Sequence, residues 1–176
     1  QHVVPLLSIG STSTSNEDDQ VRSVRAQPNL GQITKTVIQD DLCKSRLFKG
    51  AIPPHVAIAT VTFLVGLTDW IPLANCQTAW FVKKPCSCSY SYSRHNVKCR
   101  PFVPILQTLV DIVERILDEK GFNAININNY TNEKSALGYH SDGESLFQAK
   151  IRDSCIVSIS FGATRRFAIR NLQCGA

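Results

Sequence analysis

The chain has 176 residues, of which 43% are hydrophobic, and it carries a formal net charge of +5 at pH 7. That length is enough for one domain with a sizeable core, and the composition is ordinary for a globular protein. The run Val56–Leu67 is well short of the ~20 apolar residues that span a bilayer, so we expect no membrane-spanning segment and no membrane partner. The positive excess is compatible with a phosphate-bearing partner, but many proteins without such a partner share it.

Seven cysteines are scattered along the chain without the spacing of a disulfide framework. An odd, scattered set predicts reduced thiols, and with them a nuclear or cytoplasmic location. The opening run Val3–Leu7 is too short and lacks the charged flank of a signal peptide. Cys86 and Cys88, followed by Cys99, lack the paired spacing of a structural zinc site, so we do not expect zinc there.

Residues 1–36 are expected to be a flexible N-terminal segment. The Ser/Thr run Ser11–Ser15, followed by the acidic stretch Asn16–Asp19, cannot bury much apolar surface. Residues 37–176 carry the apolar runs and are expected to form the folded domain.

The apolar run Val56–Leu67 fits a buried helix, and the prolines at 53–54 favour a helix start. The β-branched and aromatic residues Val61–Phe63 leave a strand open as the alternative. Thr78–Val82 reads as a strand. The segment Pro85–Ser93, rich in Cys, Ser and Tyr, is expected to be a loop that leads to an extended edge.

Tyr90 and Tyr92 stand at strand spacing within that edge. Aromatic rings stack on bases in nucleic-acid sites, and hydroxyl groups reach phosphates. Two tyrosines at this spacing can equally pack on one face of a sheet, and the residues alone favour that interpretation.

Phe102–Lys120 is the clearest predicted helix, and Gly121 is expected to end it in the C′ position. Beyond it, the alternating segments Ile156–Phe161 and Arg166–Ile169 predict short strands. The apolar stripe of the helix recurs at helical spacing: Ile105, Leu106, Leu109, Ile112, Val113, Ile116 and Leu117.

His140 and Asp142 form a His-x-Asp pair. On an extended segment, side chains two residues apart point to the same side, so an imidazole nitrogen and a carboxylate oxygen can meet one metal ion. Such a pair supplies two corners of the 2-His-1-carboxylate triad of non-haem Fe(II) oxygenases. A turn-forming Asp beside a surface His is the alternative for the pair taken alone.

The motifs around this pair resemble those of the AlkB family of Fe(II)/2-oxoglutarate dioxygenases, in particular the branch with eukaryotic repair demethylases and viral relatives. The resemblance covers about residues 70 to 170. The motifs that carry it are Thr78-Ala79-Trp80-Phe81, Tyr90-Ser91-Tyr92-Ser93, Phe122-Asn123, Asn128-x-Tyr130, Gly138-x-His140-Ser141-Asp142-x-Glu144 and Ser158-Ile159-Ser160-Phe161-Gly162-Ala163-Thr164-Arg165.

The resemblance implies an α+β fold with a double-stranded β-helix (jelly-roll) dioxygenase core and N-terminal supporting helices. It implies Fe(II) held by His140 and Asp142, and 2-oxoglutarate as cosubstrate held in part by Asn128 and Tyr130. The implied reaction is oxidative demethylation of N-alkylated bases in DNA or RNA.

Four residues are expected to contact the substrate. Tyr90 and Tyr92 match a segment that lies over the substrate in the family, and Glu144 matches a residue of the metal-binding loop, where bracing of the loop is the alternative role. Apart from the resemblance, Arg165, with Arg166 and Arg170, could bind phosphates, although solvated charge at the end of a strand explains these arginines equally well.

Two departures from the family pattern are visible. Gly143 replaces a second Asp that the family associates with reading the base, so the base preference stays open. None of His2, His55 and His95 stands where the third iron ligand is expected, so we expect the domain to be C-terminally truncated. The alternative function is a truncated, non-catalytic nucleic-acid-binding or interaction module of the same fold. A dioxygenase that acts on protein or lipid is a third hypothesis.

Overall fold

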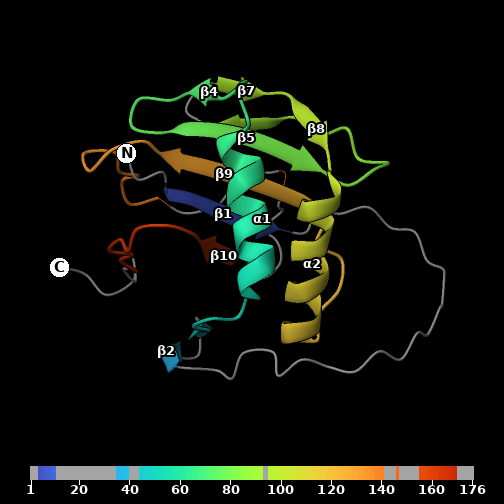
Figure 1. Ribbon diagram of the computed structural model, residues 1–176, viewed down its shortest axis with the longest axis vertical. Coiled ribbons are helices and arrows are strands. Elements are labelled where there is room, and N and C mark those ends of the chain that lie inside the picture. The colour runs from blue at the N-terminus through green and yellow to red at the C-terminus, as the bar shows by residue number, and fades with distance from the viewer. Residues whose placement is uncertain are drawn as a thin grey trace.

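The computed structural model describes residues 4–10, 35–39, 44–92, 95–140, 146 and 155–169. It consists of two helices and several short strands arranged as a sheet with the helices on one side (Figure 1). In chain order the elements are β1 (Val4–Gly10), β2 (Lys35–Gln39), β3 (Lys44–Leu47), α1 (Pro54–Val65), β4 (Ile71–Pro72), β5 (Gln77–Val82), β6 (Tyr90–Tyr92), β7 (His95–Val97), β8 (Cys99–Pro101), α2 (Pro104–Leu117), β9 (Ala124–Tyr130) and β10 (Val157–Ser160).

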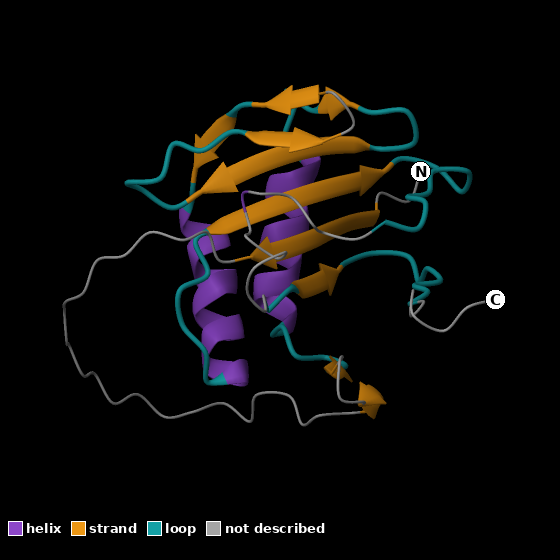
Figure 2. Ribbon diagram, turned by 180° about the vertical axis from the view of Figure 1, so that it is seen from behind, coloured by secondary structure: helices purple, strands orange, loops and turns teal. Residues whose placement is uncertain are grey.

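The main sheet has the strand order β10-β1-β9-β5-β4, and β8 pairs with β5. All of these pairings are antiparallel except that of β8 with β5, which is parallel. Two further pairs, β2–β3 and β6–β7, form small two-stranded sheets. Figure 2, seen from behind, shows the face of the main sheet that α1 and α2 leave uncovered.

Helix α1 confirms the helical interpretation of its apolar run and rules out the strand. Pro54 occupies the first turn, where its missing N–H costs nothing. Thr60 is fully buried and donates its hydroxyl to the Val56 carbonyl oxygen at 2.8 Å. The outer side is not buried, since Ile58 is 68% exposed. Within the described residues, no helix has both the length and the apolar character needed to cross a membrane.

Helix α2 confirms the predicted apolar stripe but ends earlier than expected. Its last residue is Leu117, and Asp118 takes the left-handed conformation with φ 52°. Gly121 therefore does not cap the helix and lies in the connection to β9. The reason is local: the Glu114 carboxylate accepts hydrogen bonds from the N–H of Gly121 at 2.9 Å and of Phe122 at 3.3 Å. This side chain folds the connection back onto the helix end.

The core lies between the main sheet and the helices. Strand residues alternate between the two faces of a sheet, and the residues that face α1 and α2 are apolar and buried: Ala79, Phe81, Ile125, Ile127, Ile159 and Phe161. A second, smaller cluster on the opposite face consists of Trp80, Val82, Ala124, Tyr90 and Val97. The sheet therefore has an aliphatic helix-covered face and a mixed helix-free face.

Two segments differ from the sequence-based expectations. Residues 4–10, within the segment expected to be flexible, form β1 between β9 and β10. The run is largely apolar but contains Pro5 and Gly10, which strands usually avoid. It forms a strand because β1 pairs on both sides. The predicted strand Arg166–Ile169 is wrong: these residues have no regular structure, and Phe167 is 68% exposed. An alternating pattern forms a strand only where a neighbouring strand pairs with it, and none within the described part of the chain does so.

Candidate functional site

The helix-free face of the sheet carries a set of polar side chains. Thr78 stands opposite Asn128 across β5 and β9, and Leu6 of β1 is paired with both Asn128 and Ser160. Residues directly opposite each other share a face, so Thr78, Asn128 and Ser160 lie in one row. The next row contains Asn126, whose Oδ1 accepts the Thr78 hydroxyl at 2.9 Å. Polar residues on a central strand indicate a site rather than a packing surface.

Asn128 is the most informative of these residues. Asn128 is only 6% exposed as a residue. Its amide atoms are not among the enclosed side-chain atoms that lack a hydrogen-bond partner, since in the described part of the chain that set contains only Asn129 Oδ1. An amide at this place on the helix-free face is suited to bind a polar ligand such as a carboxylate.

Its neighbour Asn129 lies on the opposite face of the sheet and forms a hydrogen bond within the protein. It is equally buried, at 6% exposed, and its Nδ2 donates to the Gln77 Oε1 at 3.0 Å. Its Oδ1 is buried without a hydrogen-bond partner in the part of the protein that the structure describes. Asn129 is thus a structural counterpart of Asn128, with the same residue type and burial but on the helix-covered face.

Tyr130 ends β9 on the same face as Asn128. Its ring is 7% exposed and packs with Cys76, Leu73 and Leu137. The Arg165 guanidinium lies over the ring, 5.5 Å from its centre. Burial raises the pKa of the Cys76 thiol, so this cysteine stays neutral beside the ring.

His140 lies in the loop that follows β9, and its side chain is exposed. Its Nδ1 is 2.8 Å from the Gly138 carbonyl oxygen. Because a carbonyl can only accept, this contact requires a proton on Nδ1, and in the neutral ring the lone pair is then on Nε2. That nitrogen is the one that could coordinate a metal, and a carbonyl partner on the other nitrogen is typical of histidine ligands.

The remaining predicted ligand lies outside the described residues. The structure does not describe Asp142 or Glu144, so it leaves the His140–Asp142 pair untested. Among the residues that it does describe, no group of three or more His, Cys, Asp or Glu side chains could hold a metal ion. The donors present fit iron and 2-oxoglutarate in kind: an imidazole with a fixed Nδ1 proton, a buried amide and a phenol.

Tyr90 and Tyr92 lie on β6, and their described surroundings differ. Tyr90 is 5% exposed and stacks on Trp80, with ring centres 5.0 Å apart and an interplanar angle of 22°. Its ring thus belongs to the small core cluster. Tyr92 is paired with His95 in the β6–β7 hairpin, and its side chain is outside the described set.

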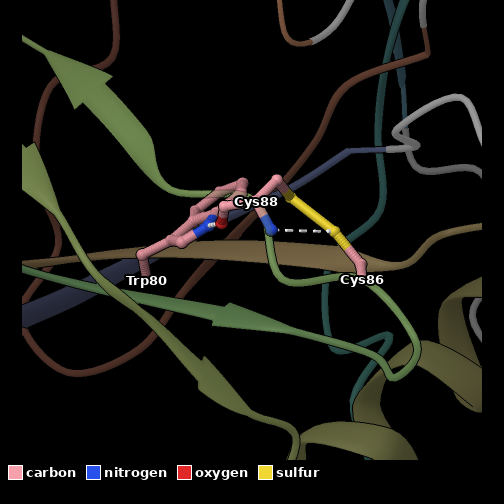
Figure 3. The surroundings of a disulfide bond; sticks show 3 residues. All are labelled: Trp80, Cys86 and Cys88. Atoms are coloured by element: carbon pink, nitrogen blue, oxygen red, sulfur yellow. Dashed lines mark hydrogen bonds between the residues drawn. A yellow bond between two sulfur atoms is a disulfide. The ribbon is translucent and has the colours of Figure 1, made fainter.

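Trp80 of β5 holds the loop that leads to the hairpin, and this loop contains a disulfide (Figure 3). The Trp80 Nε1 donates to the Cys88 carbonyl oxygen at 2.9 Å, and Cys88 is joined to Cys86 by the disulfide, with Cα atoms 5.7 Å apart. The structure therefore differs from the expectation of reduced thiols for this pair, whose Cα separation lies within the range that a disulfide spans. Free cysteines in the described part of the chain are Cys76, Cys99 and Cys155.

Arg165 follows β10, and although the residue is exposed, its guanidinium reaches the loop after β9. Its Nη1 donates to the Ser135 carbonyl oxygen at 2.6 Å, and its Nη2 donates to that of Asn132. Sequence reasoning considered Arg165 only as a phosphate ligand or a solvated charge. No spacing signal could have found these backbone partners, which lie about thirty residues earlier in the chain. The alternation of Asn126 and Asn128 with Ile125 and Ile127 was the available signal for the polar rows.

Comparison with known proteins identifies the superfamily of the chain. Residues 68–175 match the 2OG-Fe(II) oxygenase superfamily. The chain belongs to this superfamily, which implies a jelly-roll fold, and the observed helices and antiparallel strands are compatible with it.

Within the superfamily, the identification of the chain as an AlkB-family sequence is confirmed. It is 40% identical over 95 residues to alpha-ketoglutarate-dependent dioxygenase alkB homolog 3 of Homo sapiens, and this match covers 53% of the chain and 30% of that protein. The Mus musculus protein of the same name is 38% identical over 95 residues, again 53% of the chain and 30% of the relative. The chain thus matches under a third of the length of these curated relatives. No solved structure gives a significant match.

Proposed function

We propose that this protein is an Fe(II)/2-oxoglutarate-dependent dioxygenase that oxidatively demethylates N-alkylated bases in DNA or RNA. The chain belongs to the 2OG-Fe(II) oxygenase superfamily. The observation that carries the proposal is that Asn128, which is 6% exposed, and Tyr130 lie on the same strand and on the helix-free face of the sheet. The His140 loop follows that strand directly.

The candidate residues would have two roles, metal binding and cosubstrate binding. His140, through Nε2, and Asp142 would hold Fe(II), while Asn128 and Tyr130 would hold a carboxylate of 2-oxoglutarate. The Asn128 amide and the Tyr130 hydroxyl both donate hydrogen bonds, as binding of a carboxylate requires. When bound, iron and 2-oxoglutarate supply the oxidation, and the hydroxylated alkyl group leaves the base as formaldehyde.

The proposed substrate would bind at the side of the sheet that carries the β6–β7 hairpin. The base must leave its stack before an enzyme can act on its alkyl group, so aromatic and cationic residues are expected nearby. Tyr92 and Glu144 are the proposed contacts. Tyr90 would contribute by holding the hairpin through its stack on Trp80. Lys83 and Lys84 at the end of β5 and Lys98 before β8 are exposed and could contact phosphates.

The second candidate is a non-catalytic nucleic-acid-binding module of the same fold. Retained binding to single strands without Fe(II)-dependent turnover would select it.

The adjacent asparagines allow a matched experiment. Asn128→Ala should raise the 2-oxoglutarate KM for Fe(II)-dependent succinate formation by roughly ten- to hundredfold, since a hydrogen bond to a charged group contributes on the order of 1.5–3 kcal/mol. Asn129→Ala changes the same residue type at the same burial on the other face and should leave that KM unchanged. Formaldehyde release from methylated DNA and RNA oligonucleotides then defines the substrate. Equal effects of the two substitutions, or full turnover by His140→Ala, would contradict the proposal.

A further inference from the structure

Arg165 connects two parts of the molecule that lie far apart in sequence. It follows β10, yet it contacts the end of β9 and the loop that leads from β9 to His140. Its guanidinium lies over the Tyr130 ring at 5.5 Å and donates to the carbonyl oxygens of Ser135, at 2.6 Å, and Asn132. One side chain therefore touches the proposed cosubstrate residue and the loop beside it.

The loop itself is locally ordered in a way that presents these carbonyl oxygens. The Asn132 Oδ1 accepts hydrogen bonds from the N–H of Lys134 at 2.9 Å and of Ser135 at 3.0 Å, which closes a tight turn. Ser135 is 7% exposed, whereas Glu133 and Lys134 at the tip of the turn are exposed. The turn is thus held at its base and open to solvent at its tip.

The chemistry of arginine suits this position. Its planar group presents donors in a fixed fork and stacks on an aromatic ring at the same time, which the ammonium of lysine does less well. Two of its nitrogens are committed to carbonyl oxygens, so the group is poorly placed to serve as a phosphate ligand. Stacking of the same group on Tyr130 restrains the direction of that ring.

From these contacts we propose that Arg165 is a positioning residue that fixes the Tyr130 ring and the 131–135 turn together and thereby sets the affinity for 2-oxoglutarate. The inference rests on the proposed function through Tyr130. It replaces the sequence-based assignment of Arg165 to phosphate binding. Arg166, the next residue, is exposed and serves as a matched control of the same type and charge.

Two measurements test the inference, and the first needs no activity. Cleavage by the Glu-specific protease Glu-C after Glu133 reports opening of the turn, and exchanging an arginine neither creates nor removes a Glu-C site. Arg165→Ala should raise this cleavage rate by about tenfold, Arg165→Lys by less, and Arg166→Ala not at all. Circular dichroism identifies a variant that fails to fold, in which case Arg165→Lys decides the question.

The second measurement is calorimetric binding of 2-oxoglutarate to the protein loaded with Mn(II), a stand-in for Fe(II) that does not turn over. Arg165→Ala and Tyr130→Phe should each weaken binding, by roughly tenfold for Arg165→Ala, while Arg166→Ala binds like the unmodified protein. An unchanged cleavage rate in Arg165→Ala overturns the inference. The inference is also overturned if Arg165→Ala is cleaved faster but binds 2-oxoglutarate normally, provided that Tyr130→Phe does weaken this binding.

A different pattern would locate the failure elsewhere. If the unmodified protein does not bind 2-oxoglutarate, the proposed function fails. The part of the inference that links Arg165 to 2-oxoglutarate affinity then fails as well. Faster cleavage of Arg165→Ala would then show that the turn contacts are real without a role in cosubstrate binding. A loss of affinity for methylated oligonucleotides confined to Arg165→Ala, with normal 2-oxoglutarate binding, would return Arg165 to phosphate binding and overturn the inference.

Discussion

Replacing Trp80 by Phe should destabilise the protein by about 2–3 kcal/mol. Trp80 is 1% exposed, its Nε1 donates to the Cys88 carbonyl oxygen at 2.9 Å, and its ring stacks on Tyr90 at 5.0 Å. The substitution removes a hydrogen bond worth roughly 0.5–1.5 kcal/mol. It also leaves a small cavity, and the lost packing contributes on the order of 1–2 kcal/mol, a fraction of the cost of truncation to Ala.

Urea unfolding followed by far-UV circular dichroism measures this loss, which should lower the midpoint without altering the denaturant slope. Trp70→Phe is the control, because Trp70 is only partly buried and packs at the edge of the helix-side core. It should cost about 1 kcal/mol or less. Hydrogen exchange at the β6–β7 amides should accelerate in Trp80→Phe alone. If Trp80→Phe costs no more than Trp70→Phe, the reasoning that Trp80 anchors the hairpin is refuted.

Further predictions concern the core, the site face and a titrating thiol. Leu109→Ala, at a fully buried position of α2, should cost about 2–5 kcal/mol in urea unfolding, whereas Ile58→Ala on the exposed side of α1 should cost about 0.5 kcal/mol or less. Similar losses in both would contradict the assigned core. Thr78→Val should leave the Asn126 Oδ1 without its donor and cost about 1 kcal/mol; no loss would show that the 2.9 Å contact contributes nothing. Burial, together with a hydrogen bond to Glu119, raises the pKa of Cys155 from 9.0 to about 11. The folded state thus holds this proton more tightly, so the stability contributed below pH 9.0 is lost as the pH rises toward about 11. Cys155→Ala should reduce the fall in stability over this range, and parallel curves would disprove the linkage.

The sequence predicted regular elements where local pattern and tertiary packing agree. The apolar stripe of α2 packs in the core, because seven apolar residues at helical spacing form one face of the helix that is removed from water. The end of that helix was predicted wrongly, since the Glu114 side chain binds the two N–H groups that follow and lets Asp118 take the left-handed conformation. The pattern at Arg166–Ile169 failed for the opposite reason: local alternation is present, but no described strand pairs with it.

The candidate site came forward through the family resemblance, which named Asn128, Tyr130 and His140, and their roles stay predictions. The structure places Asn128 and Tyr130 on one strand and His140 in the loop that follows it. The partners of Arg165 depend on how the segment after β10 crosses the loop after β9. That crossing is a property of the folded chain, and no pattern around Arg165 encodes it.

Strand parity then explains how one short strand serves two purposes. On β9, the odd positions Ile125, Ile127 and Asn129 face the helices, while the even positions Asn126, Asn128 and Tyr130 face the other side. Helices cover only one side of the sheet, so the odd positions of β9 lie on the side of the helix-covered core and the even positions lie on the face that carries the candidate site. Because side chains alternate at every residue, a one-residue slip of β9 would bring Asn126 and Asn128 to the core and the isoleucines to the face of the candidate site. Both losses would follow from one shift, so the apolar packing that fixes the register of β9 also fixes the position of the candidate site.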